Sequence, residues 1–322
     1  MFPLCPETER TFPMIHVKNL VKRYGKLVAL DHFNLDVQDG EIFGLLGPNG
    51  SGKTTAINCI LSLLTYDKGE ISLFGEPMSP TNYKSKKKIG VVPQNVAVFN
   101  ELTVQENIDY FCGLYVPEKA ERKPLVEEAI EFAGLSDFRK FLPKKLSGGL
   151  LRRLNIACGI AHKPELIFLD EPTVAVDPQS RNSILEGIRA LNASGATIIY
   201  TSHYMEEVEQ LCSQIMIMDK GRAIATGTRE ELTALIHTGE KLTVEIPALP
   251  LSVLEQIRSL PNVLRADYGD GHLKADCKGN GHPIIDALDL LRQNDVSFGQ
   301  VYSEPPTLND VFLEITGKQL RD

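Results

Sequence analysis

The segment Gly47-Pro48-Asn49-Gly50-Ser51-Gly52-Lys53-Thr54 matches the pattern G-x-x-x-x-G-K-[ST]. In such a loop, backbone N–H groups turn inward around a β-phosphate, and the lysine amine reaches the β- and γ-phosphate oxygens. The threonine hydroxyl can ligate Mg²⁺. An apolar strand, Ile42–Leu46, is expected before the loop, and a helical stretch, residues 55–61, after it, so that a helix N-terminus points at the phosphates. The pattern therefore predicts binding of a nucleoside triphosphate.

Two adjacent carboxylates follow an apolar run further along the chain. Residues 166–169 are continuously apolar, and Asp170 and Glu171 come directly after them. In phosphate-loop enzymes an aspartate at this point holds Mg²⁺ directly or through water, and a neighbouring carboxylate can polarise the attacking water. A solvated strand end is the alternative explanation, and it would be the default without the phosphate loop.

A second anion-binding site is predicted at Ser147, Gly148 and Gly149. These residues precede an amphipathic helix that begins near Leu150. Backbone N–H groups at a helix N-terminus attract anions. An ordinary helix cap explains Ser147 alone, but it does not require the two glycines.

Composition limits the classes of protein that remain. The chain has 322 residues, of which 43% are hydrophobic and 24% charged, which is typical of a globular protein with room for two domains. A net charge of −8 disfavours a nucleic-acid partner held by a basic surface. The six cysteines form no C-x-x-C pair, and no run approaches 18 apolar residues. Residues 1–14 lack the features of a signal peptide and are interpreted as an N-terminal extension.

Strand-like and helix-like segments alternate from residue 15 to residue 236, which predicts an α/β domain. Its expected strands lie at residues 42–46, 89–92, 166–169, 197–201 and 215–218. Several are continuously apolar, as buried parallel strands are. Helices are expected at residues 123–133 and 182–191, each ending before a glycine.

The pattern changes after residue 240. Strands are expected at 242–246, 263–268, 272–277 and 296–302, and helices at 252–260, 283–293 and 308–315. The order β-α-β-β-α-β predicts a small α+β ferredoxin-like domain over residues 241–322.

The motifs, in this order and spacing, resemble the nucleotide-binding subunit of an ATP-binding cassette (ABC) transporter. The resemblance covers residues 15–236, and the joint order of the motifs makes it specific. It implies an ABC-type P-loop NTPase domain with a helical subdomain that carries the family signature. By family pattern the site residues are Gly47 to Thr54 with Thr55 (Walker A), Gln94 (Q-loop), Ser147, Gly148 and Gly149 (signature), Asp170 and Glu171 (Walker B and catalytic glutamate), Asp177 (D-loop), His203 (switch) and Tyr24 (adenine stacking).

This resemblance implies catalysis by Glu171, His203 and Lys53, with ATP bound together with Mg²⁺ at Thr54, Gln94 and Asp170. It also implies a head-to-tail dimer with a second copy of the chain, because the phosphate loop and the signature of one subunit meet across that dimer. A separately encoded membrane permease would hold the dimer at the cytoplasmic face of the membrane and contact the segment 95–110.

Two residues depart from the expected pattern, and the first of them points to one branch of the family. Leu150 stands where glutamine is frequent in the family, and Ala175 stands in the D-loop where that branch commonly has glycine. An apolar residue at the first position resembles the drug- and antibiotic-efflux branch, whose members can carry an extra C-terminal domain serving regulation or dimerisation. The segment from Pro306 to Gly317 resembles the closing segment of those members. An importer ATPase and a soluble ABC ATPase remain as alternatives, and the cargo of an exporter could be a drug, antibiotic, lipid or ion.

Overall fold

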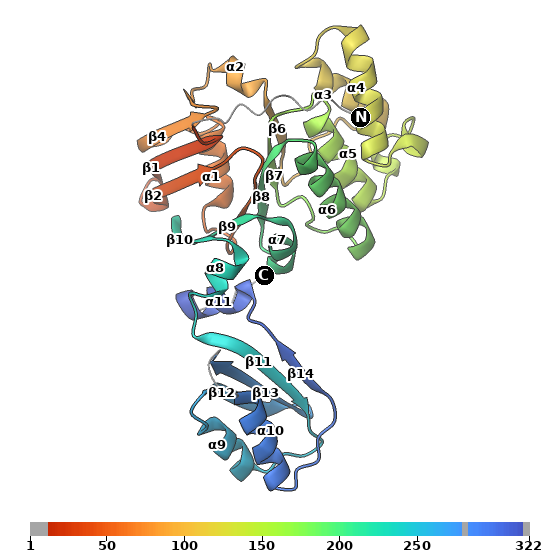
Figure 1. Cartoon of the computed structure of the whole chain (residues 1–322). Helices are drawn as coiled ribbons and strands as arrows, with labels where there is room; N and C mark the ends of the chain where they lie inside the picture. Colours follow the sequence, from red (N-terminus) through yellow and green to blue (C-terminus); the bar gives the residue numbers. More distant parts are fainter. Residues whose placement is uncertain (1–11, 279–282, 318–322) are drawn as a thin grey trace. The chain divides into compact units, whose positions relative to one another are not determined.

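The computed structural model describes residues 12–278 and 283–317, and these residues form two compact units that divide between Thr226 and Gly227 (Figure 1). The extension expected over residues 1–14 lies mostly outside the described residues. Its last residue, Met14, is buried in the core of the first unit.

The first unit is built on a six-stranded sheet with the strand order β10-β9-β3-β8-β7-β6. The pairs from β9 to β6 are all parallel. The strands are β3 (Ile42–Leu46), β6 (Ile89–Val92), β7 (Leu166–Asp170), β8 (Thr197–Ser202), β9 (Gln214–Asp219) and β10 (Arg222–Gly227). The five strands expected from the sequence are confirmed to within a residue at each end. Their continuous apolar runs are buried because helices and a second sheet cover both faces.

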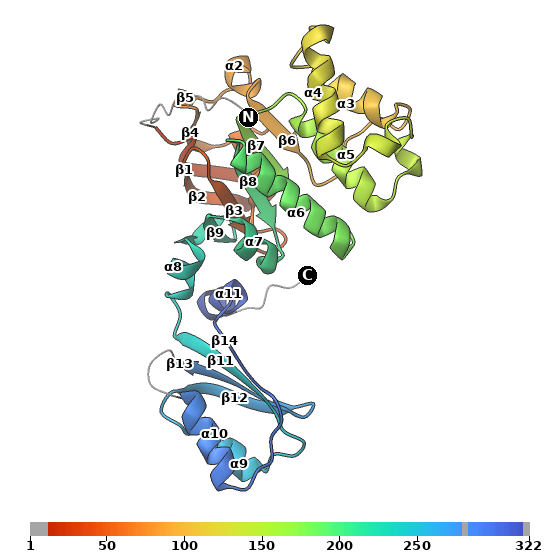
Figure 2. The ribbon, with the colours of Figure 1, turned by 45° about the vertical axis from the view of Figure 1, so that its right-hand side comes forward.

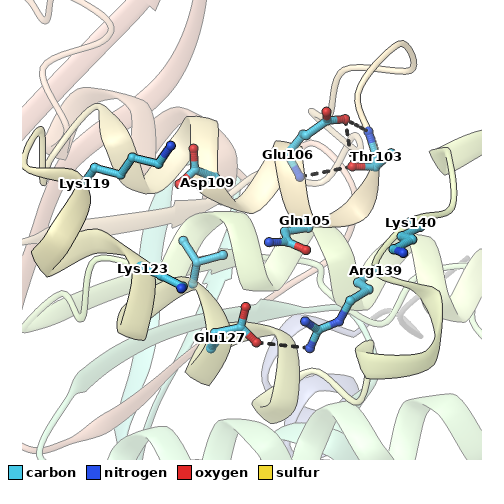
Figure 3. Close-up of a pocket in the computed structure, with 10 residues that line it drawn as sticks. Thr103, Gln105, Glu106, Asp109, Lys119, Lys123, Glu127, Arg139 and Lys140 are labelled. Atoms are coloured by element: carbon cyan, nitrogen blue, oxygen red, sulfur yellow. Dashed lines mark hydrogen bonds and ion pairs between the residues drawn. The ribbon is translucent and has the colours of Figure 1, made fainter.

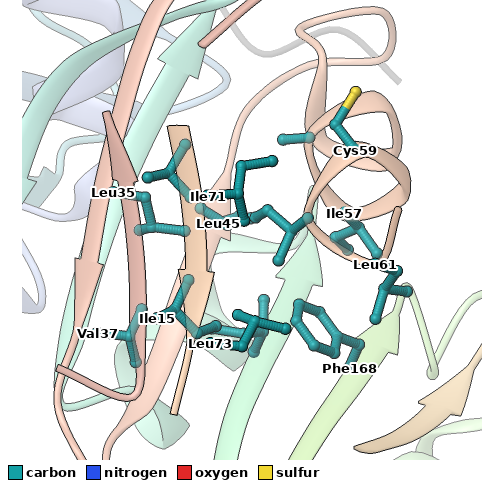
Figure 4. Close-up of a cluster of buried hydrophobic side chains, with 14 of the residues drawn as sticks. Ile15, Leu35, Val37, Leu45, Ile57, Cys59, Leu61, Ile71, Leu73 and Phe168 are labelled. Atoms are coloured by element: carbon teal, nitrogen blue, oxygen red, sulfur yellow. The ribbon is translucent and has the colours of Figure 1, made fainter. Parts of the chain in front are cut away.

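One face of this sheet packs on α1 (Lys53–Ile60) and on a second, antiparallel sheet. That sheet has the order β2-β1-β4-β5, formed by β1 (Ile15–Tyr24), β2 (Leu27–Val37), β4 (Lys68–Leu73) and β5 (Glu76–Pro77). Figure 4 shows the shared core, in which Ile57 of α1 lies in one cluster with strand residues such as Leu45 and Phe168. Since α1 is buried on both sides, the loop that precedes it is held in a fixed place.

The other face of the parallel sheet carries α6 (Pro178–Ala193) and α7 (Met205–Leu211) (Figure 2). The approach of α7 is close, because a Cβ added at Gly44 in β3 would lie 2.8 Å from a methyl carbon of Val208. The helices expected at 123–133 and 182–191 are present as parts of α4 and α6, and the glycines that follow them have positive φ.

Three helices form a subdomain around a core of their own: α3 (Val104–Gly113), α4 (Lys119–Phe132) and α5 (Gly148–Ile160). Fully buried side chains such as Ile108, Ile130 and Leu154 fill the space between them. A short α2 (Tyr83–Lys86) precedes β6, and two 3-10 turns, Ser136–Phe138 and Pro143–Lys145, join α4 to α5. The helix that begins with the signature glycines is therefore one wall of this subdomain.

The second unit contains a four-stranded antiparallel sheet in the order β12-β13-β11-β14. Its elements are β11 (Thr238–Glu245), α9 (Leu251–Arg258), β12 (Val263–Gly269), β13 (His272–Lys278), α10 (Pro283–Gln293) and β14 (Val301–Glu304). They follow one another in the β-α-β-β-α-β order expected for a ferredoxin-like unit. Buried residues of the sheet, α9 and α10 form one cluster.

The last strand of this unit is shorter than the sequence suggested. A strand was expected over residues 296–302, but β14 begins at Val301. The reason is that the backbone N–H of Val296 donates to Leu291, which ties this residue to the end of α10. Pairing with the β11 side begins only where Gly299 donates to Glu245.

The boundary between the units also falls earlier than the expected end of the first domain at residue 236. The short helix α8 (Arg229–Thr233) packs against α11 (Leu308–Thr316) within the second unit. Leu232 of α8 and Leu308, Val311 and Phe312 of α11 are buried. Among the described residues, no helix combines the length and the hydrophobicity needed to cross a membrane.

We expect a chain that ends at Thr226 to fold, because the first unit has its own core. A chain that ends at Thr238 would keep α8 without α11, which exposes Leu232 and favours self-association. Differential scanning calorimetry and light scattering of both truncated chains check this. A chain ending at Thr226 that shows no cooperative thermal transition would contradict the division into units.

Candidate nucleotide-binding and hydrolysis site

The phosphate loop joins the end of β3 to the start of α1, and its geometry requires glycine at several points. Gly50 and Gly52 have φ of 79° and 109°, in the left-handed region that favours glycine. A Cβ at Gly47 would lie 2.4 Å from the carbonyl oxygen of Met218, and one at Gly52 would lie 2.8 Å from that of Ala29. The hydroxyl of Ser51 in this loop is buried and has no hydrogen-bond partner within the described part of the chain. The loop thus offers an unsatisfied polar group in a closely packed backbone turn, as a phosphate cradle does.

Lys53 places its ammonium group inside this loop. The side chain is 5% exposed, and its Nζ donates to the carbonyl oxygens of Gly47 at 2.6 Å and Pro48 at 3.2 Å. Nζ also lies 3.7 Å from Oε1 of Glu171. Burial lowers the pKa of Lys53, while the charges of Glu171 and Asp170 act in the opposite direction. A cation held this way is available to the phosphates of a bound nucleotide.

Asp170 ends β7 beside the start of α1. Its Oδ2 accepts a hydrogen bond from the Thr54 hydroxyl at 3.0 Å, and its Oδ1 accepts one from the Thr201 hydroxyl at 2.6 Å. The hydroxyl of Thr54 and the carboxylate of Asp170 are hard oxygen ligands of the kind that Mg²⁺ binds. Because the Thr54 hydroxyl oxygen and the Asp170 carboxylate oxygen are in direct contact, both could bind the same ion, and their chemistry fits Mg²⁺.

Glu171 is the residue around which the other expected groups gather. Its side chain is 6% exposed, and its φ of 47° is unusual for a residue other than glycine. Its Oε2 accepts a hydrogen bond from Nε2 of Gln94 at 3.1 Å and lies 3.4 Å from Nδ1 of His203. That ring nitrogen is buried and has no hydrogen-bond partner among the residues that the structure describes. The structure therefore brings Lys53, Gln94, Glu171 and His203 together, from segments far apart in the sequence.

The signature and D-loop residues make only local hydrogen bonds within the part of the chain that the structure describes. Ser147 caps α5 by accepting from the N–H of Leu150 at 3.3 Å, and Asp177 caps α6 by accepting from Ser180 at 2.9 Å. Hydrogen bonds from Ser180 lower the pKa of Asp177. A Cβ at Gly149 would lie 2.3 Å from the hydroxyl oxygen of Ser180, whereas one at Gly148 would lie 3.9 Å from the carbonyl oxygen of Ala175. Close packing on α6 thus accounts for Gly149 but not for Gly148.

Tyr24 ends β1 with its ring 48% exposed. The amine of Lys22 lies 5.1 Å from the ring centroid, a cation–π distance. An exposed ring in this setting can stack on a nucleotide base. Ala175 has a left-handed φ of 59°, a conformation that favours glycine.

Three residues that the sequence did not single out hold the site in place. Thr201 in β8 donates to Asp170 and accepts from the N–H of Glu171 at 2.9 Å, so that one hydroxyl fixes both carboxylate residues. From α5, Arg152 donates to the carbonyl oxygen of Gln94 at 2.7 Å, and Asn155 donates to that of Pro93 at 3.2 Å. Both α5 side chains are buried. A signal existed in the sequence, because arginine and asparagine interrupt the apolar face of an amphipathic helix.

Three features together define an ATPase cassette of the ABC type. They are a phosphate loop with a buried lysine, a carboxylate pair at the next-but-one parallel strand, and a helix of the helical subdomain that begins with serine and two glycines. Residues 30–174 match the family model described as ABC transporter. The linearmycin resistance ATP-binding protein LnrL of Bacillus subtilis is 38% identical over 311 residues, which cover 96% of this chain and 100% of that protein. The chain belongs to the ABC transporter family, and it is an ATP-binding, ATP-hydrolysing member.

Further relatives agree with this assignment. The Nod factor export ATP-binding protein I of Ralstonia nicotianae is 34% identical, with 96% of each chain covered. Among solved structures, the dimeric post-hydrolysis state of the cassette MJ0796 bound to ADP and Pi has a TM-score of 0.61 at 28% identity. It covers 67% of this chain and 98% of its own. CbiO1 of Clostridium perfringens, part of the complex cbiONQ, has a TM-score of 0.64 at 26% identity. The match covers 69% of this chain and 91% of CbiO1.

We expect Thr201→Val to lower the rate of ATP hydrolysis, because Asp170 and Glu171 both lose their shared partner. The matched control is Thr197→Val at the other end of β8. Thr197 is equally buried, and its hydroxyl accepts from Gly40 and donates to Asp39. Each variant should lose about 1–3 kcal/mol of unfolding free energy through buried unpaired groups.

Only Thr201→Val should lower kcat for phosphate release. Denaturant unfolding together with a phosphate-release assay measures both quantities. Equal kcat values in the two variants would show that the Thr201 hydroxyl serves stability alone.

Proposed function

We propose that this chain is the ATP-hydrolysing subunit of an exporter, and that it works as a dimer bound to a separate membrane permease. The observation that carries the proposal is the buried carboxylate of Glu171, which lies next to Asp170 and within reach of Lys53, Gln94 and His203. A carboxylate fixed at this point can orient a water molecule toward a γ-phosphate.

The roles of the surrounding groups follow from their chemistry. The N–H groups of Gly47 to Thr55 and the Lys53 ammonium would bind the phosphates, and Tyr24 would stack on adenine. Thr54, Asp170 and the amide oxygen of Gln94 would hold Mg²⁺, which supplies positive charge beside the phosphates when bound. Nδ1 of His203, which makes no hydrogen bond within residues 12–278 and 283–317, would donate to a γ-phosphate oxygen.

A second copy of the chain would complete each site. Ser147, Gly148 and Asp177 make only local contacts among the described residues. The first N–H groups of a helix such as α5 have no partner within the helix, and such groups suit a phosphate. In a head-to-tail dimer, the γ-phosphate would lie between Lys53 of one copy and Ser147 of the other. ATP binding would then close the dimer, and hydrolysis would release it. The dimeric structure of the cassette MJ0796 supports a dimer by analogy.

The permease is expected to dock on the surface of the helical subdomain that follows Gln94. Phe99 and Tyr110 form an exposed edge-to-face aromatic pair there, with ring centroids 4.9 Å apart. On the neighbouring face of α3 lies a pocket of about 540 Å³ lined by charged and polar groups, with an ion pair between Glu127 and Arg139 (Figure 3). An aromatic anchor beside a polar rim is the usual composition of a protein interface.

The direction of transport is proposed from two relatives. One is named for linearmycin resistance and the other for Nod factor export, and both align over nearly the whole chain. These names favour an exporter over an importer or a soluble ATPase. As part of the same proposal, the chain would lie at the cytoplasmic face of the membrane, held there by its permease. All candidate site residues lie in the first unit. The second unit would therefore be an accessory domain that supports dimerisation or regulation.

Glu171→Gln should bind ATP with nearly unchanged affinity and lose turnover by about 10²-fold or more, because an amide cannot act as the base. The ATP-bound dimer should accumulate. Phosphate release, calorimetric titration with ATP and light scattering measure these three effects. The matched control is Glu186→Gln on the exposed face of α6, which should behave as wild type. Phosphate release by Glu171→Gln within a few-fold of wild type would remove Glu171 from the proposed role.

Tyr110→Asp should weaken binding to the permease without lowering hydrolysis by the isolated chain, because Tyr110 is 46% exposed and lies away from Glu171 in the helical subdomain. Tyr83→Asp, which alters another exposed tyrosine of the first unit, is the control. Co-purification with the partner permease measures binding. In inside-out vesicles that contain the permease, an exporter accumulates cargo with external ATP. ATP-driven loss of cargo preloaded into these vesicles would instead favour an importer.

A further inference from the structure

A buried carboxylate on α7 has no part in the chemistry described above. Glu207 is 3% exposed, and its Oε2 accepts three hydroxyl hydrogen bonds. The donors are Tyr200 at 2.6 Å, Thr173 at 2.7 Å and Ser202 at 3.2 Å. Burial and the neighbouring Glu207 raise the pKa of Tyr200 well above its usual value, so this phenol remains a donor. A charge buried this deeply is costly unless its partners are well placed.

The balancing charge comes from α6. Nε of Arg181 lies 3.2 Å from Oε1 of Glu207, and the Arg181 guanidinium carbon lies 4.8 Å from the centre of the Tyr204 ring. Arg181 is in the first turn of α6, which Asp177 caps. The ion pair therefore connects α7 to the helix that begins at the D-loop.

The three hydroxyl donors belong to segments that carry candidate catalytic groups. Ser202 and Tyr204 flank His203, and the Ser202 hydroxyl also accepts from the N–H of Tyr204 at 2.9 Å. The His203 ring lies 4.1 Å from the Tyr204 ring. These contacts fix the turn that carries His203 on both sides.

Thr173 lies two residues after Glu171, which itself has a strained, left-handed φ. The hydrogen bond from Thr173 to Glu207 therefore anchors the segment that leaves Glu171. The Glu171 carboxylate and the His203 imidazole lie 3.4 Å apart, and the segments that carry them both hydrogen-bond to the carboxylate of Glu207.

We infer that Glu207 is a positioning residue that sets the separation between the Glu171 carboxylate and the His203 imidazole, and that it links this pair to α6 through Arg181. The inference deepens the proposed function, since it rests on the roles proposed for Glu171 and His203. Glu207 does not touch the nucleotide site itself. It acts through Thr173, which lies two residues after Glu171, and through Ser202, which lies next to His203.

The full chain with Glu207→Gln tests this inference. Glutamine keeps the shape of the side chain and one acceptor oxygen, but it loses the charge that faces Arg181 and accepts fewer hydroxyl bonds. We expect kcat for phosphate release to fall about 10- to 100-fold, as small misplacements of catalytic groups do. The Kd for ATP should stay within about twofold of wild type, because the phosphate loop is unaltered.

The matched control is Glu206→Gln on the same helix, whose side chain is exposed and which should leave kcat and Kd unchanged. Thr173→Val and Ser202→Ala each remove one hydroxyl and should each lower kcat less than Glu207→Gln does. These two variants also test the inference if Glu207→Gln does not fold. In the Glu171→Gln background, Glu207→Gln should cause no further loss of the residual rate, because both act on one step.

The outcomes separate the inference from the proposed function. Hydrolysis by wild type together with an unchanged kcat in Glu207→Gln, or in Thr173→Val and Ser202→Ala, would overturn the inference alone. A weaker Kd with an unchanged kcat would also overturn it. Wild-type chain that binds ATP but releases no phosphate would overturn the proposed function and the inference with it.

Discussion

The site depends on one electrostatic constraint: the ammonium group of Lys53 must balance the negative charges of two buried carboxylates, those of Asp170 and Glu171. Asp170 and Glu171 end a strand that is covered on both faces, so neither can rely on water to stabilise its charge. Lys53 can approach Glu171 to 3.7 Å only because the loop before α1 folds tightly enough to turn its side chain back toward the sheet. That fold in turn requires glycine where Met218 and Ala29 come close. The parallel sheet, the buried helix α1 and the glycine loop therefore serve one electrostatic arrangement.

Much of this arrangement could be predicted from the sequence, because its signals are local. A glycine loop between an apolar run and a helix, or two carboxylates after a buried strand, can be recognised without knowing any neighbour. The strands of the parallel sheet were predictable for the same reason, since burial on both faces makes them continuously apolar. The antiparallel sheet of β1, β2, β4 and β5 was not predicted. Its strands mix buried and exposed residues and contain register shifts, which blur the alternation that identifies such strands.

What the sequence could not supply is pairing at long range. The Thr201 hydroxyl joins Asp170 to the N–H of Glu171 across two strands, and Arg152 reaches the backbone at Gln94 from a different subdomain. Each is a common residue type in an ordinary segment, and only the fold gives it a partner. The displaced domain boundary has the same origin, because the assignment of α8 depends on its packing against α11, more than 70 residues later in the chain.

The close approach of Gly149 to Ser180 has a mechanical consequence. With no side chain at Gly149, the first turn of α5 lies directly against the first turn of α6, and a Cβ there would also come within 3.4 Å of the Asp177 carboxylate. The first turns of α5 and α6 are therefore packed directly on each other, and neither helix can shift along its axis without displacing the other. A neighbouring molecule that engages the start of α5 would meet α6 at the same moment. The contact would form as a single step rather than as two successive ones.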